Sequence, residues 1–377
     1  MRIGILAGES SGDQLGAGLI REIHKLYPEA VFEGIGGPKM IAAGCHSLYP
    51  MEKLSVMGLV EVLKHYRELK AIRDHMVQHF LDSPPDIFIG VDLPDFNLTI
   101  ERKLKEAGIP TVHYVSPTVW AWRPGRVHGI GKSVDLILTM FPFENDIYKK
   151  HNIPVEFVGN PLADMIPLEP DRVVARHELD LPTDAEIIAL MPGSRVGELQ
   201  RHAEVFIRTA QWCHQHRPEA MFISPAATPE TKKIFQDKLN ELAPELPVTI
   251  IDGQSQKALM ACNAVLLASG TAAVEAMLMK RPMVVAYKLN WLSYQIMKRM
   301  LKVPYVCMPN NLAGREIAPE FIQHNATAEN MGRELLAYLV QPEKTSEVMQ
   351  TFREIHESLR KDADKTAARA VMKLIKD

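Results

Sequence analysis

The chain has 377 residues, of which 46% are hydrophobic and 24% charged, with a formal net charge of -3. This length suits two domains, and this composition is typical of a folded globular protein, which excludes a largely disordered chain. A net charge so close to zero gives no overall attraction to nucleic acid, so we expect no nucleic-acid partner.

The cysteines lie far apart and form neither a CxxC pair nor a Cys/His metal-ligand spacing. Scattered thiols of this kind favour a reduced, cytoplasmic protein. The first residues form a strand pattern without the apolar stretch of a signal peptide, and no uncharged apolar run reaches the roughly 18 residues that span a bilayer. We therefore expect a cytoplasmic protein, with association at a membrane surface left open.

Short apolar runs rich in β-branched residues alternate with segments of helical period along the first part of the chain. Because these runs are apolar on both faces, they predict a parallel sheet covered by helices on both sides. A helix is expected over 16–27, after the first strand. The predicted strands are 2–8, 31–35, 86–92, 111–115, 136–139 and 155–159.

The same alternation restarts near residue 186 and predicts a second parallel sheet. Segment 160–170 between the two sets contains three prolines and no sustained period, as in a linker, and the chain is helical from about 327 onward. We predict an α/β protein with two Rossmann-like domains facing a cleft, 1–164 and 165–335. The C-terminal helices, 336–377, pack back on the first domain or on a second subunit. The second set of strands is 186–191, 221–224, 248–252, 264–268 and 283–287.

Segment 8–13 (GESSGD) joins the first strand to the first helix, where the turns of a parallel sheet face the ligand. Ser11 and the backbone N–H groups suit an anion, but the segment is neither GxGxxG nor a Walker A loop. Because Glu9 and Asp13 repel a diphosphate, a sugar hydroxyl is the better ligand. The alternative is a structural turn with an aspartate helix cap. The segment also fits the GxSxG nucleophile pattern, but no histidine partner for Ser10 is identifiable.

Two carboxylates follow the strongest predicted strand of the first domain, in segment 90–97 (GVDLPDFN). A carboxylate at a strand end lies over the ligand crevice, where it suits a general base. Asp92 is favoured as the base because it ends the strand itself, whereas Asp95 is placed either to contact substrate or to cap the next helix. The alternative gives both acids capping roles only.

Aromatic and basic residues crowd segment 113–126 (HYVSPTVWAWRPGR). Trp122 and Arg123 are neighbours in it, and such a pair suits stacking on a sugar or holding a phosphate. A loop packed by its own aromatic residues is the alternative.

Segment 191–198 (MPGSRVGE) follows the first strand of the second domain and contains Ser194 and Arg195. A fixed arginine at this place stabilises the negative charge that grows on a departing diphosphate. A surface arginine without a role is the alternative.

Segment 267–277 (LASGTAAVEAM) begins a helix with the small residues Ser269, Gly270 and Thr271. Its backbone N–H groups and helix dipole therefore face a phosphate without obstruction. Glu275, one turn into the helix, is placed to accept both hydroxyls of a ribose. Together these features predict a nucleoside-diphosphate site, with a plain buried helix start as the alternative.

Asn310 and Asn311 lie in segment 303–316, between a strand-like run and a helix. Their amides either bind ligand hydroxyls and phosphate or cap the loop. The 14 histidines show no HExxH spacing, so we predict neither a metal nor a cofactor.

In this order the six motifs resemble those of the lipid-A-disaccharide synthase family along essentially the whole chain, as does segment 55–62 (SVMGLVEV). The resemblance implies a GT-B glycosyltransferase that joins an acylated UDP-glucosamine donor, UDP-2,3-diacylglucosamine, to the acceptor 2,3-diacylglucosamine 1-phosphate. The products are a β-1,6-linked disaccharide phosphate and UDP, formed with inversion and without an obligatory metal. It implies Asp92 as the base, Arg195 as the diphosphate stabiliser and Glu275 as the ribose ligand, with Glu9 and Asn310 as further substrate contacts.

Acylated substrates also imply a peripheral contact with the inner face of the cytoplasmic membrane. Two segments suit an interfacial helix, 55–71 and 291–302, although an apolar stripe is equally ordinary in a protein core. A homodimer is a possible assembly. The alternative functions are a nucleotide-sugar epimerase and a ligand-binding regulator. The apolar stripe of the first segment consists of Leu59, Val62, Leu63, Tyr66 and Leu69.

Overall fold

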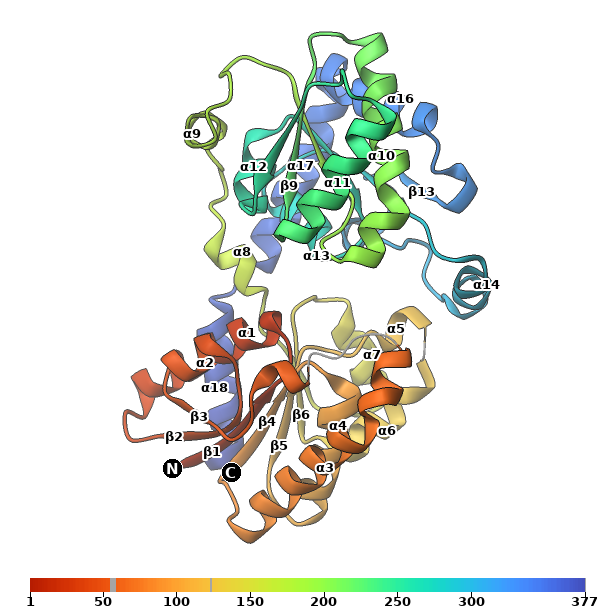
Figure 1. The fold of residues 1–377 in the computed structure, drawn as a ribbon. Helices are drawn as coiled ribbons and strands as arrows, with labels where there is room; N and C mark the ends of the chain where they lie inside the picture. The colour runs from red at the N-terminus through yellow and green to blue at the C-terminus, as the bar shows by residue number, and fades with distance from the viewer. Residues whose placement is uncertain (55–58, 123, 377) are drawn as a thin grey trace. The chain divides into compact units, whose positions relative to one another are not determined.

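The computed structural model describes residues 1–54, 59–122 and 124–376. The chain forms two compact units, one of residues 1–164 with 359–377 and one of residues 165–358 (Figure 1). The first unit therefore takes its residues from both ends of the sequence. Segment 160–170, expected to be an irregular linker, contains one short helix, α8 (Pro161–Met165).

The first unit is built on a parallel sheet with the strand order β3-β2-β1-β4-β5-β6-β7. Its strands are β1 (Arg2–Ala7), β2 (Val31–Ile35), β3 (Cys45–Ser47), β4 (Ile87–Val91), β5 (Thr111–Tyr114), β6 (Leu136–Thr139) and β7 (Val155–Phe157). Its helices are α1 (Ser10–Leu26), α2 (Pro38–Ala42), α3 (Leu59–Asp82), α4 (Pro94–Glu106), α5 (Val119–Trp122), α6 (Val127–Ser133), α7 (Glu144–Lys150) and α18 (Ala363–Lys376), with 3₁₀ turns η1 (Met51–Lys53) and η2 (Pro124–Arg126).

Helices cover both faces of this sheet (Figure 1), and an apolar core lies between the sheet and the helices on each face. One is formed by α1 and α18 against β1, β2 and β4, and the other by α3 and α4. The strands β4, β5 and β6 are buried on both faces, which explains their continuous apolar runs.

The expected separate C-terminal segment 336–377 is instead divided between the two units. Helix α18 packs on α1 because its small apolar residues face the first core. The carboxylate of Asp164 fixes the start of α18 by accepting backbone N–H groups from Lys361 (3.1 Å), Asp362 (3.1 Å) and Ala363 (2.6 Å). Unpaired N–H groups at a helix start are stabilised by such a carboxylate.

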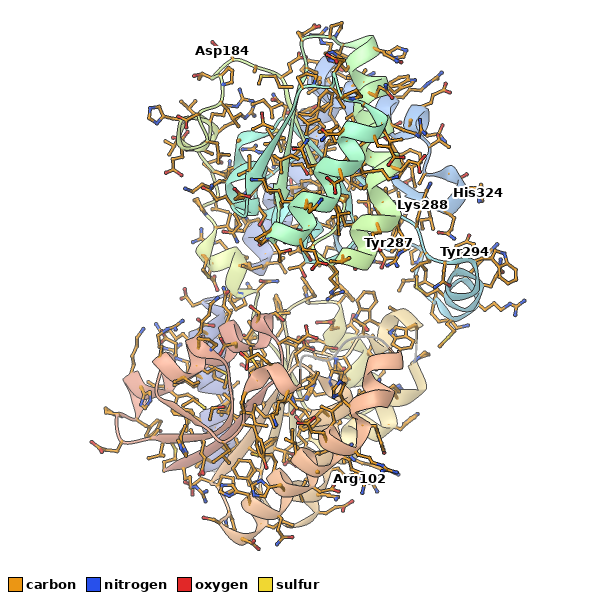
Figure 2. The ribbon with its side chains drawn as sticks, in the orientation of Figure 1. Arg102, Asp184, Tyr287, Lys288, Tyr294 and His324 are labelled. Atoms are coloured by element: carbon orange, nitrogen blue, oxygen red, sulfur yellow. The ribbon has the colours of Figure 1, made fainter. Side chains whose placement is uncertain are left out.

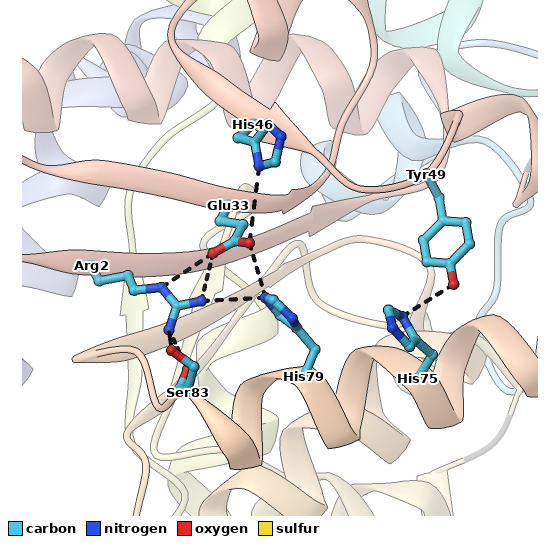
Figure 3. A network of polar contacts seen from close by, with 7 residues as sticks. All are labelled: Arg2, Glu33, His46, Tyr49, His75, His79 and Ser83. Carbon is cyan, nitrogen blue, oxygen red and sulfur yellow. Dashed lines mark hydrogen bonds and ion pairs between the residues drawn. The ribbon is translucent and has the colours of Figure 1, made fainter.

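A polar network ties β1 and β2 to α3 away from the carboxyl ends of the strands (Figure 3). Arg2 Nη2 donates to Glu33 Oε2 at 2.6 Å, and His79 Nε2 lies 2.9 Å from Glu33 Oε1. Arg2 also donates to the oxygens of Ser83. Burial of Glu33 raises the pKa of its carboxyl, but the hydrogen bond and charge of Arg2 outweigh burial and leave that pKa below its ordinary value. This network stabilises the sheet and has no part in the sites below.

The second unit repeats the plan with the parallel strand order β10-β9-β8-β11-β12-β13. Figure 1 shows α10, α11 and α16 over one face of this sheet and α12 and α17 over the other. Its strands are β8 (Ile187–Met191), β9 (Met221–Ala226), β10 (Val248–Asp252), β11 (Ala264–Ala268), β12 (Met283–Tyr287) and β13 (Glu320–Ile322). Its helices are α9 (Arg172–Glu178), α10 (Val196–His216), α11 (Pro229–Leu242), α12 (Ser255–Ala261), α13 (Thr271–Leu278), α14 (Trp291–Met300), α15 (Met308–Ala313), α16 (Ala328–Val340) and α17 (Pro342–Leu359), with the 3₁₀ turn η3 (Gln323–Asn325).

The predicted α/β class and all the predicted strands are confirmed. The strands β3 and β13 were not predicted. Each has three residues at the edge of its sheet, and three residues are too few to show a strand period. Among the described helices, none has the length and apolar run needed to cross a bilayer.

Truncating Val371, a fully buried residue of α18, tests the docking of this helix on the first unit. We expect Val371→Ala to lower the free energy of unfolding by about 1–3 kcal/mol, because two methyl groups leave the core and a cavity remains. Lys373→Ala is the matched control, since the Lys373 side chain is 71% exposed on the same helix. Urea denaturation measures both, and equal stability of the two variants would contradict the docking.

Candidate active site

The strand order of the second sheet reverses between β8 and β11, which are hydrogen-bonded neighbours. Ligands of open parallel sheets bind outside the carboxyl ends of the strands at such a reversal. A pocket of about 570 Å³ lies there. It contains the predicted residues Ser194, Arg195, Ser269, Gly270, Thr271 and Glu275.

The turn after β8 places Arg195 at the rim of this pocket. Gly193 adopts a φ of +125°, and a Cβ on it would lie 2.8 Å from the Cβ of Glu198, so only glycine fits. Arg195 precedes the first residue of α10, with its side chain 58% exposed and its Nη1 3.4 Å from Glu198 Oε1. The guanidinium is therefore held beside the pocket and accessible to an anion.

The start of α13 faces the same pocket. The first N–H groups of a helix lack partners within it and carry the positive end of its dipole. Apart from its chain neighbours, no heavy atom of the described residues lies within 4 Å of a Cβ built on Gly270, so the helix start is open to a ligand. Glu275 is half-buried one turn further on, where its Oε1 accepts from Gln256 Nε2 at 3.0 Å. A diphosphate at the helix start and a ribose at Glu275 fit this geometry.

His202 joins two loops of the pocket, and sequence reasoning missed it. Its ring is fully buried; Nδ1 lies 3.0 Å from the carbonyl oxygen of Pro192, and Nε2 accepts from Lys288 N at 2.9 Å. These partners fix a neutral ring that donates from Nδ1. Burial lowers the pKa of His202 below its ordinary value. The only sequence signal was a histidine on the inner face of a helix that follows the arginine turn.

The first sheet has its own reversal, between β1 and β4, and Asp92 lies there directly after β4. Asp92 and Leu93 both have left-handed backbones, with φ of 54° and 48°. Such conformations cost about 1–3 kcal/mol each outside glycine and gather at functional sites. Within the described residues, the half-buried carboxylate of Asp92 has no hydrogen-bond or ion-pair partner, so it is available to a substrate proton.

Two neighbours hold this strained turn. Asn97 is fully buried, and its Nδ2 donates to the carbonyl oxygen of Asp92 at 2.7 Å. A Cβ on Gly8 would lie 2.4 Å from Leu93 Cδ2, so Leu93 packs where only glycine leaves room. The GESSGD turn and the Asp92 turn therefore depend on each other.

Asp95 differs from Asp92 in its solvent exposure and in having an ion-pair partner. Its side chain is 84% exposed, and its Oδ1 accepts from Arg126 Nη2 at 2.6 Å. Leu93 is the residue that precedes α4, and within the described residues neither Asp92 nor Asp95 makes a capping hydrogen bond at that helix start. The interpretation of both acids as helix caps is therefore wrong.

The turn of segment 8–13 contains residues with different tasks. Glu9 is half-buried immediately before α1, and Ser11 is exposed in its first turn. Asp13 is buried and accepts the backbone N–H groups of Lys39 (3.0 Å) and Met40 (2.9 Å). The aspartate therefore caps α2, while Glu9 and Ser11 remain candidates for substrate contact.

The aromatic segment 113–126 is partly structural. His113 Nδ1 lies 2.7 Å from Glu101 Oε1, and both side chains are fully buried. Trp122 is 38% exposed and donates from Nε1 to Thr118 Oγ1 at 3.0 Å. Arg123 lies outside the described residues, and its substrate contact stays a prediction.

Asn310 is a structural residue. Its side chain is fully buried; Oδ1 accepts from Ile317 N (2.8 Å) and Ala318 N (2.9 Å), and Nδ2 donates to Ala318 O and Glu320 Oε1, both at 2.8 Å. Its amide is therefore occupied by the protein, and the predicted substrate contact is not supported. Asn311 likewise donates to the carbonyl oxygens of Tyr305 and Cys307.

The residues of the apolar stripe in segment 55–71 differ in their exposure to solvent. Tyr66 is 51% exposed, whereas Leu69 packs against the core formed with α3 and α4. Residues 55–58 and the side chains of Leu59, Val62 and Leu63 lie outside the described part. In that part, no three His, Cys, Asp or Glu side chains are arranged to hold a metal ion.

Solved structures of low sequence identity share this fold. A UDP-GlcNAc 2-epimerase from Neisseria meningitidis, bound to UDP-GlcNAc, is similar over 100% of both chains, with a TM-score of 0.65 and 12% identity. A glycotransferase of kitacinnamycin is similar over 99% of this chain and 98% of its own chain, with a TM-score of 0.63 and 14% identity. With its two parallel-sheet domains, the protein is of the GT-B class.

The sequence comparisons narrow this class to one family. Residues 3–374 match the family model described as Lipid-A-disaccharide synthetase. The lipid-A-disaccharide synthase of Hahella chejuensis is 52% identical over 100% of this chain and 94% of its own, and that of Methylobacillus flagellatus is 50% identical over 99% of each. The chain belongs to the lipid-A-disaccharide synthase family and is a glycosyltransferase. The resemblance seen in the motifs is thereby confirmed over the epimerase and regulator alternatives.

Removing the Asn310 amide tests its structural role. We expect Asn310→Ala to lower the free energy of unfolding by about 2–4 kcal/mol, because the N–H groups of Ile317 and Ala318 lose their buried acceptor. Asn240→Ala is the control, since Asn240 is exposed on α11, and its stability should stay within about 0.5 kcal/mol of wild type. A loss no larger than that of the control, in urea denaturation, would refute the structural role.

The buried neutral His202 predicts a pH dependence of stability. A histidine with a lowered folded-state pKa binds fewer protons than in the unfolded chain, so its contribution is complete above its ordinary pKa of 6.5 and falls as the pH drops below it. We expect the free energy of unfolding to fall more between about pH 8 and about pH 5 in wild type than in His202→Gln. Equal pH slopes in urea denaturation would count against this assignment.

Proposed function

We propose that this protein condenses UDP-2,3-diacylglucosamine with 2,3-diacylglucosamine 1-phosphate to give the β-1,6-linked lipid A disaccharide 1-phosphate and UDP. Family membership over nearly the whole chain supports the reaction. The observation that carries the nucleotide-sugar part is the pocket between β8 and β11, which gathers an arginine, a helix start and a carboxylate in one unit.

The donor's nucleotide binds this pocket through three kinds of contact. Glu275 accepts the ribose hydroxyls, and the N–H groups and hydroxyls at the start of α13, with Ser269 and Thr271, hold the diphosphate. Arg195, together with the Ser194 turn, stabilises the negative charge that develops on the leaving UDP. These positive groups do the electrostatic work that a divalent metal does elsewhere, so the proposal needs neither metal nor cofactor.

The acceptor hydroxyl is deprotonated by Asp92. An inverting displacement forms the new glycosidic bond on the face opposite the leaving UDP, and the hydroxyl proton goes to a base on the acceptor side. The half-buried carboxylate at the first sheet's reversal, which has no partner among the described residues, supports this role. Glu9 and Ser11 follow β1 and Trp122 follows β5, the two strands that flank β4 in the sheet, so they are proposed acceptor contacts. Arg123 is proposed with them from the sequence alone.

Both substrates carry acyl chains, so we propose that the enzyme works on the inner face of the cytoplasmic membrane as a peripheral protein. Exposed aromatic side chains support this proposal, Tyr66 at 51% and Trp291 at 72% exposure. Tyrosine and tryptophan suit the boundary between lipid and water. A homodimer is a further proposal on assembly.

Release of UDP from UDP-2,3-diacylglucosamine, with and without the 1-phosphate acceptor, tests the function. We expect release that depends on acceptor in wild type, and a fall of about 10²- to 10⁴-fold in kcat for Asp92→Asn, because the hydroxyl proton loses its base. Asp95→Asn should fall by less than about tenfold, since Asp95 is exposed and paired with Arg126.

Two results would contradict this proposal in different ways. Acceptor-independent conversion of the donor by folded wild type would exclude the transferase. Acceptor-dependent release of UDP that persists in Asp92→Asn but collapses in Asp95→Asn would support the transferase function and assign the role of base to Asp95 instead of Asp92. Thermal melting of each variant confirms that it is folded.

A further inference from the structure

A second pocket of about 420 Å³ lies in the same unit beneath α14. Figure 2 shows Tyr294 on α14 beside the body of the unit, with Tyr287 and Lys288 at the end of β12 and His324 after β13. The pocket is therefore lined by the end of β12, helix α14, the loop that follows it, β13 and the 3₁₀ turn η3. Its apolar walls are Leu289, Met297, Leu301, Val303, Val306 and Ile322.

Six apolar side chains line this pocket beside polar ones such as Lys298 and Asn325, and the apolar ones are incompletely covered. Each of the six apolar side chains is half-buried, although large apolar side chains of a protein interior usually pack without space between them. The carboxylate of Glu320, which also lines it, accepts from Val306 N (2.8 Å), Cys307 N (3.0 Å) and Asn310 Nδ2 (2.8 Å). Its charge is therefore compensated by the protein, and the space offers a ligand mainly apolar contact.

One wall residue, Leu289, is held in place by a side-chain amide of the protein. Gln323 accepts from Leu289 N at 2.7 Å and donates to Leu289 O at 3.1 Å, so one amide holds both polar groups of that residue. An apolar cavity of about 150 Å³ accommodates a benzene molecule. The volume beneath α14 therefore has room for a long hydrocarbon chain.

Tyr287 lines both this pocket and the nucleotide pocket, so the two are neighbours. The nucleotide pocket extends from Gln254, after β10, to Tyr287, the last residue of β12, on opposite sides of the β8–β11 reversal. Glu275 is bonded to Gln256 on the β10 side. A nucleotide with its ribose at Glu275 and its diphosphate at the start of α13 therefore directs its sugar toward Tyr287.

We propose that the pocket beneath α14 binds an acyl chain of the donor sugar and so selects donors by their acylation. This inference rests on the function proposed above. It gives the half-buried apolar side chains of α14 and β13 a ligand and explains why an apolar pocket adjoins a polar one. Tyr287 then lies between the sugar in the nucleotide pocket and the acyl chain in the pocket beneath α14.

Filling the pocket tests the proposal. The readout is the ratio of kcat/KM for UDP-2,3-diacylglucosamine with long acyl chains to kcat/KM for the analogue whose acyl groups are acetyl. We expect Met297→Trp and Leu301→Trp to lower this ratio by about tenfold or more. Each methylene of the acyl chain that the indole keeps out of the pocket weakens binding of the long-chain donor by a factor of about four. Arg299→Trp adds the same indole to an exposed position of α14 outside the pocket, and should keep the wild-type ratio.

Calorimetry with UDP alone separates this effect from damage to the nucleotide pocket, and we expect both pocket variants to bind UDP with wild-type affinity. An unchanged ratio in folded pocket variants, with wild type active, would overturn the acyl pocket and leave the transferase intact. Wild type that releases UDP from neither donor would refute the proposed function, and this inference with it. The two pocket variants replace different wall positions, so misfolding of one leaves the other as the test.

Discussion

Both sheets are parallel throughout, so every strand presents its carboxyl end at the same edge. In each sheet the strand order reverses once, between β1 and β4 and between β8 and β11. The loops that follow the two strands at a reversal run to opposite faces of the sheet. A crevice therefore opens between them, in which backbone N–H groups and side chains are accessible. Asp92 lies at one reversal, and Arg195 with Ser269 to Thr271 at the other. The chemistry of the protein depends on this property of the backbone.

Backbone strain accompanies the first reversal. Besides Asp92 and Leu93, Val115 at the end of the neighbouring strand has a φ of 81°, which is rare for a β-branched residue. Asn97 and the bare Cα of Gly8 hold the first two, and the strands beneath are fully buried. A rigid support of this kind is what keeps an unfavourable turn in place.

Much of this organisation was predictable from the sequence because it is encoded locally. Long apolar runs predicted the strands, and the small residues from Ser269 to Thr271 predicted a helix start open to phosphate. Residues whose roles depend on distant partners were not predictable. Asp13 caps a helix 26 residues further along, Asn310 is occupied by the backbone of another loop, and His202 bonds Lys288, 86 positions away. A pattern of residue types reports what a side chain is able to do, not which partner the tertiary fold supplies.

The return of α18 to the first unit makes the second unit an insertion within it. The core of α1, β1 and β2 includes Ala367, Ala368 and Val371, so it remains incomplete until the last helix has been synthesised. The inserted unit, in contrast, has all of its strands before residue 323. During synthesis on the ribosome, the part of the chain made first is therefore the part that finishes folding last. In the interval, its exposed apolar sheet is a natural substrate for chaperones.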